Sequence, residues 1–356
     1  SWRRSPDLIL ERETEVSHPR NILLGAQAGS VQLPVCDHYS GVEARMRKSL
    51  QLQAEMTQEF GTCVFDVTLD CEDGAPVGGE AEHAALVTEL ALSTSAATPD
   101  ARIAVRVHAV DHPSFDADMA VIAGRAGRVL THIMVPKVES VTDVDRAQAA
   151  LISAGAADLP LHVLIESPAA VHRAFDIAAH PRVQSISFGL MDFVSAHGGA
   201  IPAEGMGTGL GQNPSGLGQF THPLVLRAKL EIASACHAHG KVPSHCVVTE
   251  FKNREAVRMA AQKASRELGY SRMWSIHPDQ IRPILEAMAP SNAQIEQASE
   301  IILAAQAAQW APISHAGQLH DRASYRFFWQ LLERAHQTGR PLPAAIHVFF
   351  AASADR

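Results

Sequence analysis

Residues 161–166 read Leu-His-Val-Leu-Ile-Glu, and residues 185–192 read Ser-Ile-Ser-Phe-Gly-Leu-Met-Asp. Both are short apolar runs that lead to an acidic residue, a pattern typical of parallel strands covered on both faces. Similar runs recur at residues 31–34, 64–70, 103–107, 133–136, 241–247 and 273–276. Longer stretches with helical periodicity separate them, at 43–60, 80–92, 141–153, 168–179, 224–239 and 254–268.

Eight strand–helix units within about 280 residues predict an α/β fold of the (β/α)8 TIM barrel type. An open doubly wound sheet is the alternative that strand counting leaves open. We expect the barrel at residues 31–290, an N-terminal extension at 1–30 and a C-terminal helical appendage at 291–356. The appendage, with helices near 295–309 and 325–336, is a candidate lid. Residues 198–218 are rich in Gly and should form a long functional loop after the sixth strand.

Composition excludes several classes of protein. The chain has 356 residues, of which 46% are hydrophobic, so it can bury a sizeable core. Its apolar runs are too short to span a bilayer, and residues 1–20 lack the apolar stretch of a signal peptide. A net charge of -8 argues against nucleic-acid binding. Five cysteines without a Cys-x-x-Cys pair fit a reducing cytoplasm.

Charged residues follow five successive candidate strands. In a (β/α)8 barrel the reacting groups gather at the carboxyl ends of the strands, so these side chains should converge on one mouth. Packing alone gives no reason for such convergence. The residues concerned, from the second strand to the sixth, are Asp70, Glu72 and Asp73, then Arg106, Lys137, Glu166 and Asp192.

Glu166 and Asp192 are the candidate metal ligands. Each emerges directly after an apolar run, and the two runs are neighbouring strands of the predicted barrel. Two carboxylates suit a hard divalent cation such as Mg²⁺, which keeps several waters and takes further ligands from substrate oxygens. The alternative is that either acid caps the following helix or pairs with Lys137.

Arg106 and Lys137 are the candidate cationic groups of the same mouth. Arg106 could clamp a carboxylate or stabilise a developing enolate oxygen, or it could form a structural ion pair with Asp70, Glu72 or Asp73. Lys137 could in principle attack a carbonyl, but neighbouring acids such as Glu139 and Glu166 would keep it charged. We therefore expect a structural or substrate-orienting lysine.

Six motifs in order resemble those of a known family. They are Leu-Asp-Cys-Glu-Asp-Gly at 69–74, Val-Arg-Val-His-Ala at 105–109, Val-Pro-Lys-Val-Glu at 135–139, Leu-Ile-Glu-Ser-Pro at 164–168, Phe-Gly-Leu-Met-Asp at 188–192 and Ile-His-Pro-Asp-Gln-Ile at 276–281. Together they are similar to the citrate lyase beta-subunit-like branch of the HpcH/HpaI aldolase superfamily, which includes malyl-CoA lyases. The resemblance covers roughly residues 31–335.

This resemblance implies a barrel that holds Mg²⁺ through Glu166 and Asp192, with Arg106 beside the substrate. The implied reaction cleaves a 3-hydroxyacyl thioester, often a CoA ester, into an oxo acid and an acyl thioester. Gly-Gln-Leu-His-Asp at 317–321 resembles the family's lid sequence, which makes Asp321 a candidate acid/base in its own or a neighbouring subunit. Asp70 and Asp73 are the other candidates for moving the proton. A homo-oligomer, trimer or hexamer, is expected by analogy.

Two departures concern the thioester half of the substrate. Where relatives have a Pro-Gly turn and an arginine that binds CoA, residues 34–41 read Pro-Val-Cys-Asp-His-Tyr-Ser-Gly, with Arg45 following. The seventh strand ends in Ser-His-Cys at 244–246, where many relatives carry an aspartate. A metal-dependent aldolase acting on free 2-oxo-4-hydroxy acids, or a non-catalytic barrel that binds an acyl ligand, therefore stays open.

Overall fold

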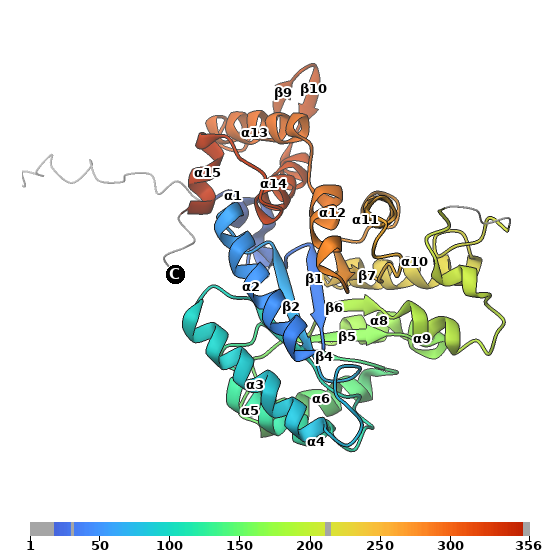
Figure 1. The fold of residues 1–356 in the computed structure, drawn as a ribbon. Helices are drawn as coiled ribbons and strands as arrows, with labels where there is room; N and C mark the ends of the chain where they lie inside the picture. Colours follow the sequence, from blue (N-terminus) through green and yellow to red (C-terminus); the bar gives the residue numbers. More distant parts are fainter. Residues whose placement is uncertain (1–17, 30–31, 211–214, 352–356) are drawn as a thin grey trace, which may run out of the picture. The chain divides into compact units, whose positions relative to one another are not determined.

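Eight parallel strands close into a barrel in sequential order, and β8 pairs with β1 (Figure 1). The computed structural model of the chain describes residues 18–29, 32–210 and 215–351. The fold is therefore the predicted (β/α)8 barrel, not an open sheet. Its strands are β1 (Cys36–Ser40), β2 (Phe65–Asp70), β3 (Ile103–Arg106), β4 (Ile133–Val135), β5 (Leu161–Ile165), β6 (Val183–Phe188), β7 (Val242–His245) and β8 (Arg272–Ser275).

Helices surround the barrel and pack on the outward-facing residues of the strands, such as Val67, Ile133 and Val163. Helices α2 and α6 match their expected bounds, and a capping box of Ser140 and Asp143 fixes the start of α6. The helices of the barrel are α2 (Glu43–Phe60), α3 (Glu80–Ala97), α4 (Phe115–Asp118), η2 (Met119–Ala123), α5 (Gly124–Ala126), α6 (Val141–Ser153), α7 (Pro168–His172), α8 (Ala174–Ala179), α9 (Leu190–Ser195), η3 (Ala203–Met206), α10 (Pro223–Ala238), α11 (Arg254–Arg266) and α12 (Pro278–Met288).

Two local predictions are wrong. The single helix expected at 168–179 is two helices, because Arg173 leaves helical geometry with φ -98° and ψ 10°. The first strand lies at Cys36–Ser40 and not at 31–34; residue 31 is outside the described residues. Strand β1 escapes an apolar-run search because it carries polar side chains on both faces. Asp37 contacts Arg272 inside the barrel, and His38 contacts Ser49 of α2 outside it.

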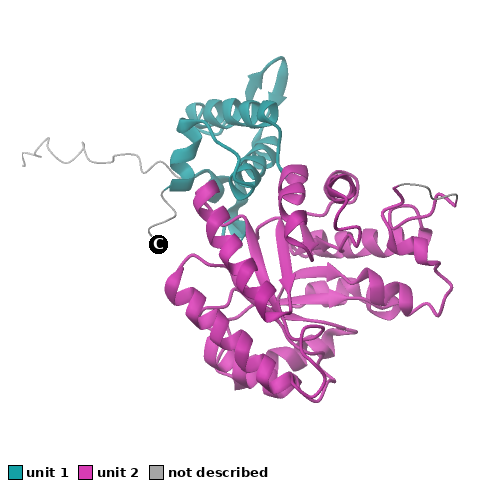
Figure 2. Ribbon diagram, in the orientation of Figure 1, with its two compact units in different colours: residues 1–32, 289–356 teal, residues 33–288 magenta. Residues whose placement is uncertain are grey.

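The chain divides into two compact units, which Figure 2 colours separately. Residues 33–288 form the barrel, and residues 1–32 and 289–356 form the second unit, called here the terminal unit. Leu23, Ile302 and Trp329 belong to its separate hydrophobic core. The described elements of the terminal unit are α1 (Pro19–Leu24), η1 (Gly25–Gln27), α13 (Asn292–Ala307), the hairpin of β9 (Ile313–His315) and β10 (Gln318–His320), α14 (Arg322–Gln337) and α15 (Ala344–Ala351).

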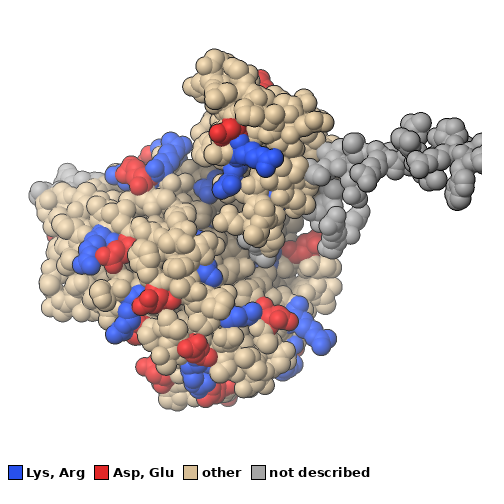
Figure 3. Space-filling view, turned by 180° about the vertical axis from the view of Figure 1, so that it is seen from behind, with Lys and Arg blue, Asp and Glu red and all other residues tan. Residues whose placement is uncertain are grey.

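Within the described residues, none of the helices is both long and apolar enough to cross a membrane. On the face that Figure 3 shows, basic and acidic side chains are interspersed, and many lie beside a group of opposite charge. Several exposed ion pairs of this kind occur, such as Arg227–Glu231 on α10 and Arg258–Glu255 on α11.

The inward-facing residues of the strands form three layers along the barrel. The lower layer, near the amino ends of the strands, consists of Asp37, Asp66, His132, His162 and Arg272, with Arg102 at its edge. The middle layer is mainly apolar and contains Tyr39, Met134, Leu164 and Trp274. The upper layer, at the carboxyl ends, contains Asp70, Arg106 and Glu166.

Candidate active site at the carboxyl ends of the strands

A cavity of about 740 Å³ lies at the carboxyl ends of the barrel strands. Six of the residues predicted from the sequence line it, namely Arg45, Asp70, Asp73, Arg106, Glu166 and Asp192. Glu72 and Lys137 line a second cavity of about 410 Å³ together with Asp73. The structure therefore brings the charged residues of five strand ends together, as the sequence predicts. The larger cavity is also lined by residues that no strand-end pattern of the sequence indicates: His38, Tyr39, Lys48, Phe251, Trp274 and His277.

Glu166 follows the last residue of β5 and is 5% exposed. Its Oε1 atom accepts a hydrogen bond of 2.8 Å from the backbone N–H of Lys137. Burial, together with the nearby negative charges of Glu72 and Asp192, raises the pKa of this carboxyl to about 8. As an isolated carboxylate, Glu166 is therefore poorly stabilised by the protein.

Gly189 makes room for this carboxyl group at the end of β6. A Cβ atom at position 189 would lie 2.5 Å from both Cβ and Oε2 of Glu166. The glycine thus allows Glu166 to approach Asp192, which lies in the first turn of α9. The Asp192 carboxyl group contributes to the raised pKa of Glu166. The pair that the sequence suggested as metal ligands therefore lies in one cavity, close enough for one acid to affect the other.

Arg106 is bound by three carboxylates at once. Its Nε and Nη2 atoms donate to the two carboxylate oxygens of Asp70 at 2.7 Å each. Nη2 also donates to Asp73 at 2.9 Å, and Nη1 lies 2.9 Å from Glu72 Oε2. The structural ion pair that the sequence left open as an alternative is thus present, and all three candidate partners take part in it.

Two aromatic rings cover the guanidinium of Arg106. Its Cζ atom lies 5.4 Å from the ring centroids of both Tyr39 and Trp274, and the two rings are 4.2 Å apart. Such contacts stabilise a cation and limit the access of water to it. Tyr39 and Trp274 are single aromatic residues on separate strands. No periodic pattern in the sequence therefore predicts that they pack on Arg106.

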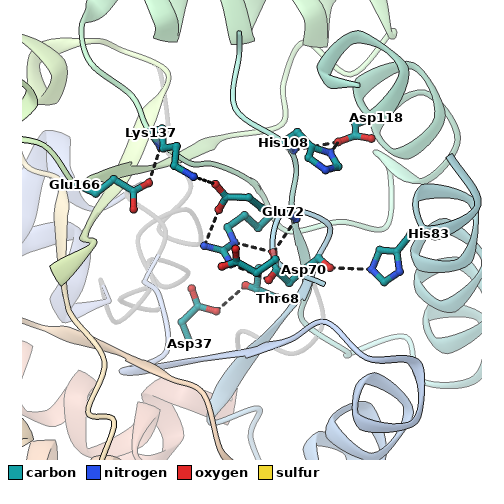
Figure 4. A network of polar contacts seen from close by, with 11 residues as sticks. Asp37, Thr68, Asp70, Glu72, His83, His108, Asp118, Lys137 and Glu166 are labelled. Carbon is teal, nitrogen blue, oxygen red and sulfur yellow. Dashed lines mark hydrogen bonds and ion pairs between the residues drawn. The ribbon is translucent and has the colours of Figure 1, made fainter. Parts of the chain in front are cut away.

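Lys137 adopts a backbone φ of 52°, which directs its N–H toward Glu166 while Nζ bonds Glu72 Oε1 at 2.5 Å. Figure 4 shows Lys137 between these two acids. Burial alone would lower the pKa of the lysine, but Glu72 and the charges of Glu166 and Asp192 raise it. The lysine is therefore a cation, as expected, although Glu139 is not its partner; the Glu139 carboxylate accepts from Ser167 Oγ at 2.7 Å.

The charges of this cluster do not balance. Five carboxylates (Asp70, Glu72, Asp73, Glu166 and Asp192) face two cations (Arg106 and Lys137), which leaves a net charge of -3 when all are ionised. Hard oxygen donors with an excess of negative charge fit a divalent cation of the Mg²⁺ type. The residues present therefore suit the metal that the sequence suggested.

Asp321 belongs to the terminal unit and not to the barrel. It is the N-cap of α14, where its carboxylate accepts hydrogen bonds from the backbone N–H groups of Ala323 and Ser324. An aspartate at this position stabilises the start of a helix. The proposed role of Asp321 as an acid/base stays a prediction.

Comparison with known proteins agrees with this architecture. The sequence profile of the family described as HpcH/HpaI aldolase/citrate lyase matches residues 50–278. An L-malyl-CoA/beta-methylmalyl-CoA lyase of Rhodobacter capsulatus is 31% identical over 240 residues, which cover 63% of this chain and 73% of the relative.

Two solved structures are also similar. A citrate lyase from Burkholderia xenovorans LB400 is 46% identical, with a TM-score of 0.74 over 94% of this chain and 99% of that one. The protein CitE from Mycobacterium tuberculosis, solved with magnesium, acetoacetate and coenzyme A, shares the fold at 20% identity, with a TM-score of 0.60 over 85% and 98% of the two chains. The chain thus belongs to the HpcH/HpaI aldolase/citrate lyase family and is a carbon–carbon lyase of the aldolase type.

Proposed function

We propose that this lyase depends on Mg²⁺ held by Glu166 and Asp192, and that it cleaves or forms a 3-hydroxyacyl thioester. The observation that carries the proposal is that Glu166 and Asp192 line one cavity, in a cluster where five carboxyl groups face two cations. A buried carboxyl group with a raised pKa becomes a stable carboxylate when a divalent cation lies beside it. The malyl-CoA lyase and citrate lyase relatives support the reaction class.

When bound, the metal supplies a Lewis acid that polarises and orients the oxygens of the hydroxy acid. The side chains around it have separate tasks. Arg106 donates a hydrogen bond to the oxygen on which negative charge develops as the carbon–carbon bond breaks. Asp70 holds the guanidinium in a fixed plane through its two hydrogen bonds, and Tyr39 and Trp274 shield it from water.

The proton is moved by a carboxylate. Asp321 is the candidate that the resemblance suggests, and its contribution requires that the terminal unit of the same or another subunit reach the cavity. Asp73 is the candidate within the barrel, since it lines the cavity and its side chain is 79% exposed. In a homo-oligomer, Asp321 of a neighbouring subunit could move the proton. A monomer would rely on Asp73.

The CoA ester is favoured over a free acid by the relatives and by the cavity. The cavity includes two basic residues of α2, Arg45 and Lys48, outside the acidic cluster. Such residues suit the phosphates of a CoA tail. The alternative substrate is a free 2-oxo-4-hydroxy acid, which needs no such basic patch. Measuring oxo-acid release from CoA esters and from the matching free acids separates the two.

The metal site is tested with Glu166→Ala and Asp192→Ala. We expect each variant to lose Mg²⁺ binding in calorimetry and to lose lyase activity by at least about two orders of magnitude. Glu204→Ala, which removes an exposed acid of η3, is the control and should behave like the wild type. Full metal-dependent activity in either site variant would show that the metal is held elsewhere. No Mg²⁺ binding and no turnover by the wild type would instead favour a non-catalytic barrel.

A further inference from the structure

Asp73 lies where the two cavities meet, and it lines both of them. Its carboxylate occupies Nη2 of Arg106, and Glu72 occupies the adjacent Nη1. These two atoms form the outer edge of the guanidinium, which is the edge that a bidentate carboxylate ligand uses. The side edge, formed by Nε and Nη2, is already taken by Asp70. A ligand can therefore reach the outer edge of Arg106 only by displacing Asp73 or Glu72.

The three acids differ greatly in how firmly they are held. Asp70 is 8% exposed and makes two hydrogen bonds to Arg106. Glu72 is 11% exposed and also binds Lys137 Nζ. Asp73 is 79% exposed, and no described contact other than that with Arg106 holds its carboxylate. Because the Asp73 carboxylate is already largely hydrated and makes a single hydrogen bond to Arg106, it is the acid that a ligand can displace most easily.

We propose that Asp73 holds the place of a substrate oxygen on Arg106 Nη2 and moves away when that oxygen binds. The proposal rests on the proposed function, because it concerns the same cavity. Once Asp73 has left, Glu72 still occupies Nη1 and Asp70 still occupies the side edge. On its outer edge Arg106 then offers a single N–H, that of Nη2, which suits one carbonyl or enolate oxygen and not a bidentate carboxylate. The carboxylate of an oxo acid must accordingly bind elsewhere in the cavity, on the side of Glu166 and Asp192.

The second cavity gives the displaced carboxylate a place to go. It contains Lys137, whose side chain is 48% exposed and can accept an additional anionic partner. Two histidines, His108 and His112, stack there with ring centroids 4.2 Å apart, and Asp118 fixes His108 through a 2.6 Å hydrogen bond. Movement of Asp73 toward Lys137 would keep its charge compensated and would join the two cavities.

The test uses oxalate, a small dianion that resembles the enolate of an oxo acid, and calorimetry on the full chain with saturating Mg²⁺. We expect Asp73→Ala and Asp73→Asn to bind oxalate about two- to fivefold more tightly than the wild type, because the competing carboxylate is gone. Asp70→Asn should bind it more weakly, since Arg106 loses its bidentate anchor. Asp111→Ala is the matched control, because Asp111 lines the second cavity but forms neither a hydrogen bond nor an ion pair with Arg106.

Asp111→Ala also removes one negative charge near the site, so it reports the general effect of charge on oxalate binding. If Asp73→Ala binds oxalate no more tightly than Asp111→Ala, the place-holding role is wrong. The steady-state readout is a lower KM in Asp73→Ala, a change that a purely structural role would not produce. Repeating the oxalate titration in EDTA separates this proposal from the metal site, because the contact with Arg106 does not require Mg²⁺.

Discussion

The barrel contains two charged layers that differ in balance and in access. In the lower layer, Arg272 and Arg102 face Asp37 and Asp66, so two cations match two anions. In the upper layer and its surroundings, five carboxylates face two cations. The middle layer of Tyr39, Met134, Leu164 and Trp274 separates the two. The same barrel therefore holds one layer in which acidic and basic side chains balance and one in which acidic side chains are in excess.

The difference in balance matches a difference in surroundings. Arg272 is fully buried, lies 2.7 Å from Asp66 and 3.1 Å from Asp37, and donates to the backbone carbonyl of Pro34 at 2.8 Å. The upper layer instead borders a cavity of about 740 Å³ and keeps Glu166 as a poorly compensated acid. A sealed layer must satisfy its own charges, whereas an open layer can leave a deficit for a ligand to fill.

The largest expected effect comes from breaking the balance of the lower layer. Arg272→Met would leave Asp37 and Asp66 buried with only Arg102 beside them. Removing one partner of a buried ion pair typically costs about 3–5 kcal/mol. We therefore expect a loss of this size in the free energy of unfolding, measured with urea. Arg258→Met, which breaks an exposed pair on α11, is the control and should change stability little. An equally stable Arg272→Met variant would mean that the lower layer contributes nothing to stability.

Replacing Glu166 of the upper layer by a neutral residue should stabilise the protein, whereas Arg272→Met in the lower layer should destabilise it. The folded protein holds the pKa of Glu166 at about 8, above the ordinary value of 4.5, so folded protein binds this proton more tightly than unfolded protein does. Stability of the metal-free protein is therefore lost as pH rises from about 4.5 through 8. Glu166→Gln, in EDTA at pH 8.5, should be more stable than the wild type by about 2–4 kcal/mol.

The gain in Glu166→Gln should nearly vanish at pH 4.5, where the wild-type carboxyl group is protonated in the folded state and about half protonated in the unfolded state. It should also shrink when Mg²⁺ is added, because the metal stabilises only a protein that binds it. Urea unfolding at the two pH values, with and without Mg²⁺, measures all three comparisons. A Glu166→Gln variant that is less stable than the wild type at pH 8.5 in EDTA would show that the carboxylate is well compensated in the free protein.

The upper layer could be predicted from the sequence and the lower layer could not. Acids and bases that directly follow apolar runs mark strand ends, and barrel topology then places them at one mouth. Glu166, Asp192 and Arg106 were found in this way. What sequence could not give is the sharing of Arg106 among three acids, because ion pairing depends on side-chain directions that strand order does not fix.

The lower layer is hidden in strands that were recognised by their apolar residues. Asp66 and His162 are the second residues of β2 and β5, and Arg272 is the first residue of β8. Each alternates with apolar residues on the opposite face, and this alternation is the one signal that could have revealed an inward polar layer. Strand β1 contains more polar than apolar residues. The apolar-run criterion therefore predicts it at 31–34, about five residues before its actual start at Cys36.

The smallest expected effect concerns the histidines of the lower layer. They should make the free energy of unfolding fall at low pH, whereas Glu166 of the upper layer should make it fall at high pH. His132 and His162 stack with ring centroids 3.4 Å apart and are fully buried. Burial, together with the positive charge of Arg272, lowers the pKa of His162 to about 3. Its Nε2 lies 2.8 Å from Gln184 Oε1, and among the described residues its Nδ1 has no hydrogen-bond partner that could stabilise a second proton.

Because the folded pKa of His162 lies below the ordinary value of 6.5, the unfolded protein binds its proton more tightly. Stability should therefore fall as pH drops from about 6.5 toward 3, by up to about 1.4 kcal/mol per pH unit for this one group. His162→Gln keeps a polar side chain but cannot titrate, so the slope of stability against pH between 6 and 4.5 should decrease. His237→Gln, on the exposed face of α10, should leave that slope unchanged. If the slope of stability against pH is unchanged in His162→Gln, other groups cause the loss of stability in acid. The contrast between a lower layer destabilised at low pH and an upper layer destabilised at high pH would then be wrong.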